Sequence, residues 1–233
     1  MKTDTCVTYD VLRQIAFSMG ASLFGVADLD RIREDTDLLN PCYDAYSRGI
    51  SVGVTLDEAA LAGIVDGPTP EYCREYIRVN AVLDSIARAL AEAIERIGAS
   101  AVRIPASEVV DWERLRGHLP HKLIGRYAGH GWIGRNILLV HPHFGARVRY
   151  VTVLTDLPLE PDSPTERSCG TCMRCVAVCP AGAPKEDPKR FDLRACFNKL
   201  AEFNERLDEP HFICGLCVSA CRGNKTGEKG GAT

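Results

Sequence analysis

The chain has 233 residues, of which 45% are hydrophobic and 25% are charged, and its formal net charge is −3. This composition is typical of a folded globular protein, and the small negative charge gives no electrostatic basis for binding nucleic acid. No stretch approaches the roughly 20 apolar residues of a membrane span. We therefore expect one large or two modest domains that bind neither membranes nor nucleic acid.

Helices and strands alternate in the first two thirds of the chain. Apolar side chains recur every three or four positions over residues 9–19 and again over residues 71–97, which predicts two helices, each ended by a glycine. Short apolar or alternating runs predict strands at residues 22–27, 50–54, 101–104, 137–140 and 148–155. Strands flanked by helices predict an α+β or α/β layer domain.

A glycine-rich stretch at residues 118–136 differs from plain scaffold. Gly129, Gly131 and Gly134 would let the backbone approach a flat or anionic ligand closely. Their spacing matches a dinucleotide-binding fingerprint, but no preceding strand and no acidic residue about 20 positions later accompany it, so we reject a Rossmann fold. Two interpretations stay open, a ligand site or a glycine-rich turn packed under Trp132.

Three prolines within residues 156–168 predict a linker after this first domain. The last residues, rich in glycine and lysine, predict a disordered tail. We therefore expect a first domain at 1–160, a small second domain at 161–224 and a tail at 225–233.

Eight of the eleven cysteines lie in the predicted second domain. One run has the spacing C-x2-C-x2-C-x3-C-P, a single cysteine follows, and a second run has the spacing C-x2-C-x3-C. A cubane cluster needs four thiolates, and in two-cluster ferredoxins the last cysteine of a run ligates the other cluster. The pattern predicts two [4Fe–4S] clusters, cluster 1 held by Cys169, Cys172, Cys175 and Cys221, and cluster 2 held by Cys179, Cys196, Cys214 and Cys217.

Zinc and disulfides are the alternatives for these cysteines. Zinc binds four-cysteine sites with two-residue spacing but does not require the x2-x2-x3-Pro run. Disulfides fit worse, because the N-terminus has no apolar signal segment and the cysteine count is odd, which indicates a reducing, cytoplasmic compartment. Cys6, Cys42 and Cys73 are expected to be ordinary buried thiols.

Residues 128–136, residues 153–159 and the eight cysteines resemble epoxyqueuosine reductase and its relatives, a family that is similar to the corrinoid reductive dehalogenases. The resemblance implies an α+β protein in which a nitroreductase-like α/β domain binds cobalamin and precedes a small, bacterial-ferredoxin-like domain with two clusters. In that family the clusters pass electrons to the corrinoid cobalt. The resemblance also implies that the glycine-rich loop faces the corrin, through the candidate cofactor-binding residues Gly129, Gly131, Trp132, Gly134, Arg135 and Asn136.

The chain departs from this family at the catalytic residue. The aspartate that donates the proton in epoxyqueuosine reductases aligns with Leu115, and a nearby glutamate aligns with His121. The chain is also much shorter and lacks the C-terminal repeat region that helps to grip tRNA, so we do not expect a true epoxyqueuosine reductase. Other groups could donate the proton instead, or have only structural roles: His118, His121, Tyr127 and His130.

These observations predict an iron–sulfur oxidoreductase that passes electrons from two clusters to cobalamin, to reduce a small-molecule substrate or to activate a corrinoid. The alternative is an electron-transfer, ferredoxin-like protein that docks a partner and binds no corrinoid. Flavin is a further possibility, because the nitroreductase-like fold often carries it and no residue here selects corrin over flavin. The expected electron donor is a low-potential protein of the ferredoxin or flavodoxin type.

Overall fold

The structure is a computed structural model that describes residues 5–36, 39–115, 117–205, 207 and 211–224, without the side chains of residues 5–8. The chain divides into two compact units, and each unit combines distant segments. Unit 1 comprises Met1–Val54, Asn80–His130 and Arg149–Thr165, and unit 2 comprises Thr55–Val79, Gly131–Val148 and Glu166–Thr233. The chain passes from unit 1 to unit 2 after Thr165, within the predicted linker. The other points at which it passes between the units were not predicted. The predicted tail at 225–233 lies outside the described residues.

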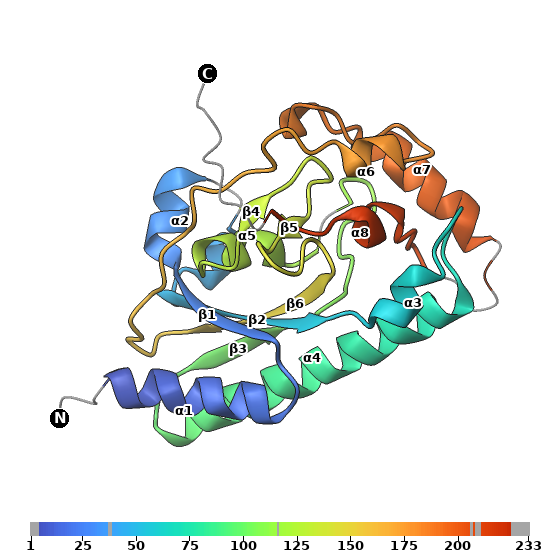
Figure 1. The fold of residues 1–233 in the computed structure, drawn as a ribbon. Coiled ribbons are helices and arrows are strands. Elements are labelled where there is room, and N and C mark those ends of the chain that lie inside the picture. Colours follow the sequence, from blue (N-terminus) through green and yellow to red (C-terminus); the bar gives the residue numbers. More distant parts are fainter. Residues whose placement is uncertain (1–4, 37–38, 116, 206, 208–210, 225–233) are drawn as a thin grey trace. The chain divides into compact units, whose positions relative to one another are not determined.

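A four-stranded sheet with the order β1-β2-β6-β3 forms the centre of unit 1 (Figure 1). Its strands are β1 (Leu23–Asp28), β2 (Arg48–Thr55), β3 (Ala101–Ile104) and β6 (Val148–Thr155). β1 pairs antiparallel with β2, and β3 pairs antiparallel with β6. The strands predicted at 101–104 and 148–155 are confirmed at their bounds. Those predicted at 22–27 and 50–54 are confirmed within two residues.

Helices cover both faces of this sheet (Figure 1). α1 (Thr5–Ser18) and the part of α4 (Pro70–Arg96) that belongs to unit 1 lie on one face. α2 (Leu29–Asp35) and α5 (His121–Tyr127) lie on the other. The sequence predicted α1 and α4 but neither α2 nor α5. Two-sided cover explains why six of the eight residues of β2 are buried.

Side-chain size differs between the two faces of the sheet. A Cβ at Gly49 would lie 2.9 Å from the side chain of Ile124 in α5 and 3.0 Å from Leu29 in α2, so only glycine admits both helices. Because successive strand residues alternate, Ile50 and Val52 point to the opposite face, where both are fully buried. Small residues thus bring α2 and α5 close, and branched residues fill the other layer.

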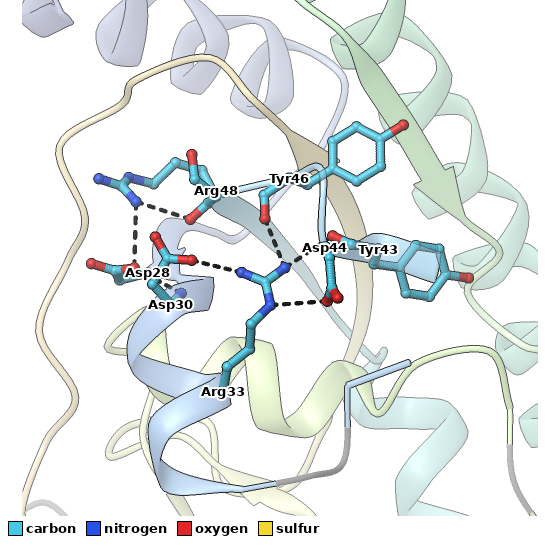
Figure 2. Close-up of polar contacts among 8 residues, drawn as sticks. Asp28, Asp30, Arg33, Tyr43, Asp44, Tyr46 and Arg48 are labelled. Atoms are coloured by element: carbon cyan, nitrogen blue, oxygen red, sulfur yellow. Dashed lines mark hydrogen bonds and ion pairs between the residues drawn. The ribbon is translucent and has the colours of Figure 1, made fainter. Parts of the chain in front are cut away.

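Arg33 of α2 holds the segment between α2 and β2, which includes the 3₁₀ helix η1 (Pro41–Tyr43) (Figure 2). Its guanidinium donates to Asp30 at 2.7 Å and to the carbonyls of Tyr43 and Tyr46 at 2.9 Å each. At the start of β2, Arg48 donates to Asp28 at 3.4 Å. The two bonds from Arg33 to Tyr43 and Tyr46 satisfy loop carbonyls that have no partner in the sheet.

Asp162 fastens the segment after β6 to the edge strand β1 and to α1. Its Oδ2 accepts from the backbone N–H of Val26 at 2.8 Å and from the hydroxyl of Tyr9 at 2.9 Å. Its own N–H donates to the carbonyl of Val26 at 2.8 Å. Burial and the nearby carboxylate raise the pKa of Tyr9, so the phenol remains a donor.

Replacing Asp162 with alanine is expected to lower the free energy of unfolding by about 2 kcal/mol, because the N–H of Val26 loses its side-chain acceptor in a part-buried site. Tyr9→Phe removes only the phenol bond and should cost about 1 kcal/mol or less. Urea unfolding of both variants measures the difference. Equal losses of unfolding free energy in the two variants would show that the bond to Val26 contributes nothing.

Unit 2 consists of short elements around the cysteine runs. They are α3 (Glu58–Ala62), the first part of α4, β4 (Trp132–Ile133), β5 (Leu139–Val140), α6 (Arg174–Ala177), η2 (Pro188–Arg190), α7 (Leu193–Asn204) and α8 (Leu216–Ala220). β4 and β5 form a hairpin with Trp132 opposite Val140. The strand predicted at 137–140 is thus only partly confirmed. In the described part of the chain, no helix is both long and apolar enough to cross a membrane.

Candidate metal centre

Four cysteines of unit 2 line one cavity of about 160 Å³. They are Cys179, Cys196, Cys214 and Cys217, the set predicted to hold cluster 2. Much of the remaining wall is apolar, with Pro180, Leu200 and Leu216 among its residues, so the thiols face a largely apolar space.

Local caps and turns position these thiols. The side chain of Asp192 accepts from the N–H of Ala195 and begins α7, which places Cys196 in the first turn of the helix. Gly215, with φ 83°, separates Cys214 from α8 and lets the chain turn between Cys214 and Cys217. A Cβ at Gly215 would also lie 2.6 Å from the side chain of Ile64.

The cysteines predicted for cluster 1 form a second group within unit 2. Cys169 and Cys221 pack against a small core made by Trp132, Val140 and Ala146. Burial, together with the neighbouring thiolates of Cys169, Cys221 and Cys172, raises the pKa of Cys175 to about 11. The sulfur atoms of Cys169, Cys172 and Cys221 therefore lie within electrostatic range of that of Cys175.

Thiols of the cavity also resist ionisation. Burial raises the pKa of Cys196 to about 11, with further contributions from Cys179 and Cys214, and burial also raises the pKa of Cys217. A buried group of thiolates needs bound cations to offset its charge. The all-sulfur donor set suits iron–sulfur clusters and zinc. Among the described residues, no three His, Cys, Asp or Glu side chains are grouped closely enough to hold a single metal ion.

The glycines of the predicted loop approach the protein's own backbone. A Cβ at Gly131 would lie 1.9 Å from the carbonyl oxygen of Val140, and one at Gly129 would lie 2.9 Å from that of Ser163. A Cβ at Gly134 would lie 2.7 Å from the side chain of Val140. Packing of the β4–β5 hairpin thus accounts for Gly131 and Gly134 without a ligand.

The three side chains predicted to bind the corrin lie beside the cysteine loops. The indole N–H of Trp132 donates to Sγ of Cys169 at 3.3 Å. Arg135 donates to the carbonyls of Gly170 and Cys172 at 3.0 and 3.1 Å. Asn136 is 3% exposed and lines the cysteine cavity. Their side chains therefore belong to the surroundings of the two thiol groups.

Two of the four predicted proton donors are tied into the core of unit 1. His121 bonds Thr152 through Nδ1 at 2.8 Å and the carbonyl of Pro105 through Nε2 at 2.9 Å. Because a carbonyl only accepts, Nε2 carries the proton and Nδ1 accepts from the Thr152 hydroxyl. The hydroxyl of Tyr127 donates to Asp35 at 2.5 Å. Burial, followed by that hydrogen bond, raises the pKa of Tyr127.

The other two predicted donors differ in exposure. His118 is partly exposed and pairs with Glu108 at 3.2 Å. His130 is buried, stacks on Tyr150 and bonds the carbonyl of Ser51 at 3.1 Å, and burial lowers its pKa. The hydroxyls of Ser51 and Tyr150 are buried without a hydrogen-bond partner among the described residues. His130 therefore lies beside Ser51 and Tyr150 in a buried polar group.

The bonds of His121 predict a pH dependence of stability. Burial lowers its pKa to about 4, whereas an unfolded chain protonates histidine near pH 6.5, so the unfolded state binds more protons between these values. The contribution is fully present above about pH 6.5. As pH falls toward 4, the free energy of unfolding should drop by at most about 1.4 kcal/mol per pH unit from this residue.

Comparison with His121→Gln isolates this contribution, because His130 remains in both proteins. Denaturant unfolding between pH 7 and 4.5 should give a shallower pH slope for the variant. Identical slopes would contradict the assignment.

Sequence reasoning missed some residues of the cavity wall. Ile137, Leu138 and Lys199 line it together with the cysteines. Helical spacing could have identified one of them, because Lys199 lies three residues after Cys196 and shares its face of α7. Of the remaining thiols, Cys73 is buried as predicted, whereas Cys42 is exposed, so that prediction was wrong. The side chain of Cys6 lies outside the described residues.

Comparison with curated proteins finds relatives for about half of the chain. An epoxyqueuosine reductase of Bacillus anthracis is 30% identical over 117 residues, which are 47% of this chain and 30% of that protein. The chain thus spans about a third of the length of such relatives. No model of a protein family matches the chain.

Solved structures share the fold over most of the chain. An epoxyqueuosine reductase in complex with a modified tRNA stem loop matches 96% of this chain and 67% of its own, with a TM-score of 0.66 and 19% identity. A reductive dehalogenase with B12-dependent dehalogenation matches 91% of this chain and 31% of its own, with a TM-score of 0.70 and 17% identity. The mixed α/β fold is therefore that of these reductases.

Proposed function

We propose that this chain is an iron–sulfur oxidoreductase with two [4Fe–4S] clusters. The premise is that the chain belongs to the epoxyqueuosine reductase-like family. Electrons would pass from the clusters to a bound cobalamin, for reduction of a small molecule or reductive activation of a corrinoid. One observation carries the iron–sulfur part. Four cysteines from two separate runs and from α7 line one cavity in unit 2.

The cavity thiols of unit 2 suit this role because they line a largely apolar cavity. Each cluster would take one thiolate from the other run, Cys179 in cluster 2 and Cys221 in cluster 1, a crossing typical of two-cluster ferredoxins. Apolar walls around the cavity would exclude water from cluster 2. Arg135 would hold the loop of cluster 1 through two carbonyls.

The corrinoid part of the proposal has separate support. The fold is similar to that of a B12-dependent reductive dehalogenase. Unit 1 also contains two buried hydroxyls, on Ser51 and Tyr150, that a bound group could satisfy. When bound, cobalamin would supply a metal centre that accepts the electrons. Flavin would use the same buried hydroxyls, so the choice between the two rests on the family.

Proton delivery is assigned to residues near the glycine-rich stretch. Among the four predicted donors, His121 and Tyr127 are engaged in structural bonds, so we favour His130 and His118. His130 is neutral at pH 7 because burial lowers its pKa, so it would have to take up a proton before acting as an imidazolium donor. His118 is partly exposed and lies beside Glu108.

The alternative function is electron transfer alone, with unit 1 docking a protein partner and binding no corrinoid. In either case the electron donor would be a low-potential ferredoxin or flavodoxin. Reduction of an epoxide on tRNA is not proposed, because Leu115 occupies the position of the family's proton donor and the chain is slightly acidic.

Two measurements on protein purified without oxygen test the proposal. Iron and acid-labile sulfide should each approach about eight per chain, with a broad absorbance near 400 nm. Incubation with cobalamin should then give a retained base-off cob(II)alamin spectrum. Iron without retained corrinoid would favour the alternative, and zinc or no metal would overturn the iron–sulfur assignment.

A further inference from the structure

We propose that the segment from Trp132 to Asn136 adjusts the reduction potentials of the two clusters separately, through one side-chain N–H donor directed at each. Trp132 would serve cluster 1, and Asn136 would serve cluster 2. This inference rests on the proposed function, since it requires both clusters. All residues involved belong to unit 2.

The bond to cluster 1 is present between protein atoms. Trp132 Nε1 donates to Sγ of Cys169 at 3.3 Å, in a side chain that is 5% exposed. Arg135 fixes the same loop by donating to the carbonyls of Gly170 and Cys172. The indole and the cysteine loop are therefore held in register from two points, and the N–H···S bond follows from that register.

The donor for cluster 2 is a buried amide. Oδ1 of Asn136 accepts from the N–H of Leu138 at 3.3 Å. A flipped amide would place two donors against each other, so this bond fixes which side-chain atom is nitrogen. Nδ2 is then buried and has no hydrogen-bond partner among the described residues.

A cluster would supply the acceptor that this amide lacks. Asn136 lines the cavity together with Cys179, Cys196, Cys214 and Cys217. The other side chains of the wall are apolar or, in the case of Lys199, only a donor. Sulfur is therefore the acceptor that the side chains around this cavity offer to Nδ2. A buried amide needs such a partner, because leaving it unpaired costs free energy.

Each donor should raise the potential of its own cluster. Reduction adds one electron to the cluster, and an N–H directed at sulfur stabilises the added negative charge. Removing the donor should make reduction about tenfold less favourable at a given potential, which for a one-electron couple is about 59 mV toward more negative values.

Potentiometric titration followed by EPR, on anaerobic protein with iron counted in each sample, tests this. Asn136→Ser keeps an oxygen that can accept from Leu138 but cannot reach the sulfur, and it should shift only the midpoint of cluster 2. Trp132→Phe should shift only cluster 1. Cys196→Ser identifies the signal of cluster 2, and Asn204→Ser, the same change at an asparagine that does not line the cavity, should shift neither.

Pulsed EPR on protein labelled with ¹⁵N in asparagine side chains detects the contact directly. Reduced cluster 2 should show a ¹⁵N coupling that Asn136→Ser abolishes. A wild-type protein with about eight irons, no ¹⁵N coupling and unchanged midpoints in both variants would overturn this inference alone. A wild-type protein without iron would overturn both this inference and the proposed function.

Discussion

Replacing Cys196 with serine should halve the iron content, from about eight to about four per chain, and remove the EPR signal of one cluster. Cys196 is the one ligand that α7 contributes to the cavity, and no other cysteine lines that cavity besides the three already assigned. A serine hydroxyl is a poor substitute for the soft thiolate that iron–sulfur clusters select. In the proposed assignment, cluster 1 takes its four thiolates from elsewhere, so it should persist.

The control for this variant is Cys42→Ser, which removes an exposed thiol of unit 1 and should keep about eight irons. Iron and acid-labile sulfide are measured after anaerobic reconstitution, together with zinc. Full retention of iron in Cys196→Ser, or equal loss from both clusters, would contradict the assignment of ligands. Stoichiometric zinc in wild-type protein would show that the cysteines hold zinc instead of iron–sulfur clusters.

Replacing Gly131 with alanine should destabilise unit 2 by about 3 kcal/mol and release iron from cluster 1. The added Cβ would lie 1.9 Å from the carbonyl oxygen of Val140 and 2.8 Å from its carbonyl carbon. Backbone atoms cannot rotate away as a flexible side chain can, so the β4–β5 hairpin must open. Trp132, the residue after Gly131, begins β4. Its bond to Cys169 would break when the hairpin opens.

Gly182→Ala is the matched control. Gly182 also belongs to unit 2 and has φ 58°, but a Cβ there would meet nothing within 4 Å. It should cost only the strain of a left-handed alanine, about 1 kcal/mol. Thermal unfolding and iron content of the two variants separate crowding from backbone strain. A similar loss of stability and iron in both variants would mean that contact with Val140 is unimportant.

The same glycines show how sequence and structure share the explanation. Their spacing predicted a close approach of backbone, and a close approach is present at Gly131. The sequence left open whether a ligand or the protein would fill the space. The partner, Val140, lies nine residues further along, and only pairing of β4 with β5 places its carbonyl there.

Short helices were missed for a physical reason. α2 and α5 have seven residues each, well below the roughly 12 residues at which an isolated helix becomes stable. Their apolar residues gain stability only by packing on the sheet, as Ile124 and Leu29 do over Gly49. α4, with 27 residues and a continuous apolar stripe, was predicted because its pattern is long enough to read locally.

The histidines illustrate the same limit. A cluster of His118, His121 and His130 in sequence suggested a set of proton donors. Their bonding partners, such as Thr152 for His121 and Ser51 for His130, lie 31 and 79 residues away. Spacing along the chain carries no information on such contacts, so the sequence could not separate a structural histidine from a reactive one.

By itself, the sequence determined the two groups of cysteines, the long helix and most strands of the sheet, because each depends on spacing within a few turns of chain. Only the tertiary structure decided that unit 2 combines three separate segments, and that Trp132 and Asn136 lie beside the thiols. Those features depend on contacts between residues dozens of positions apart, which packing selects and local patterns do not encode.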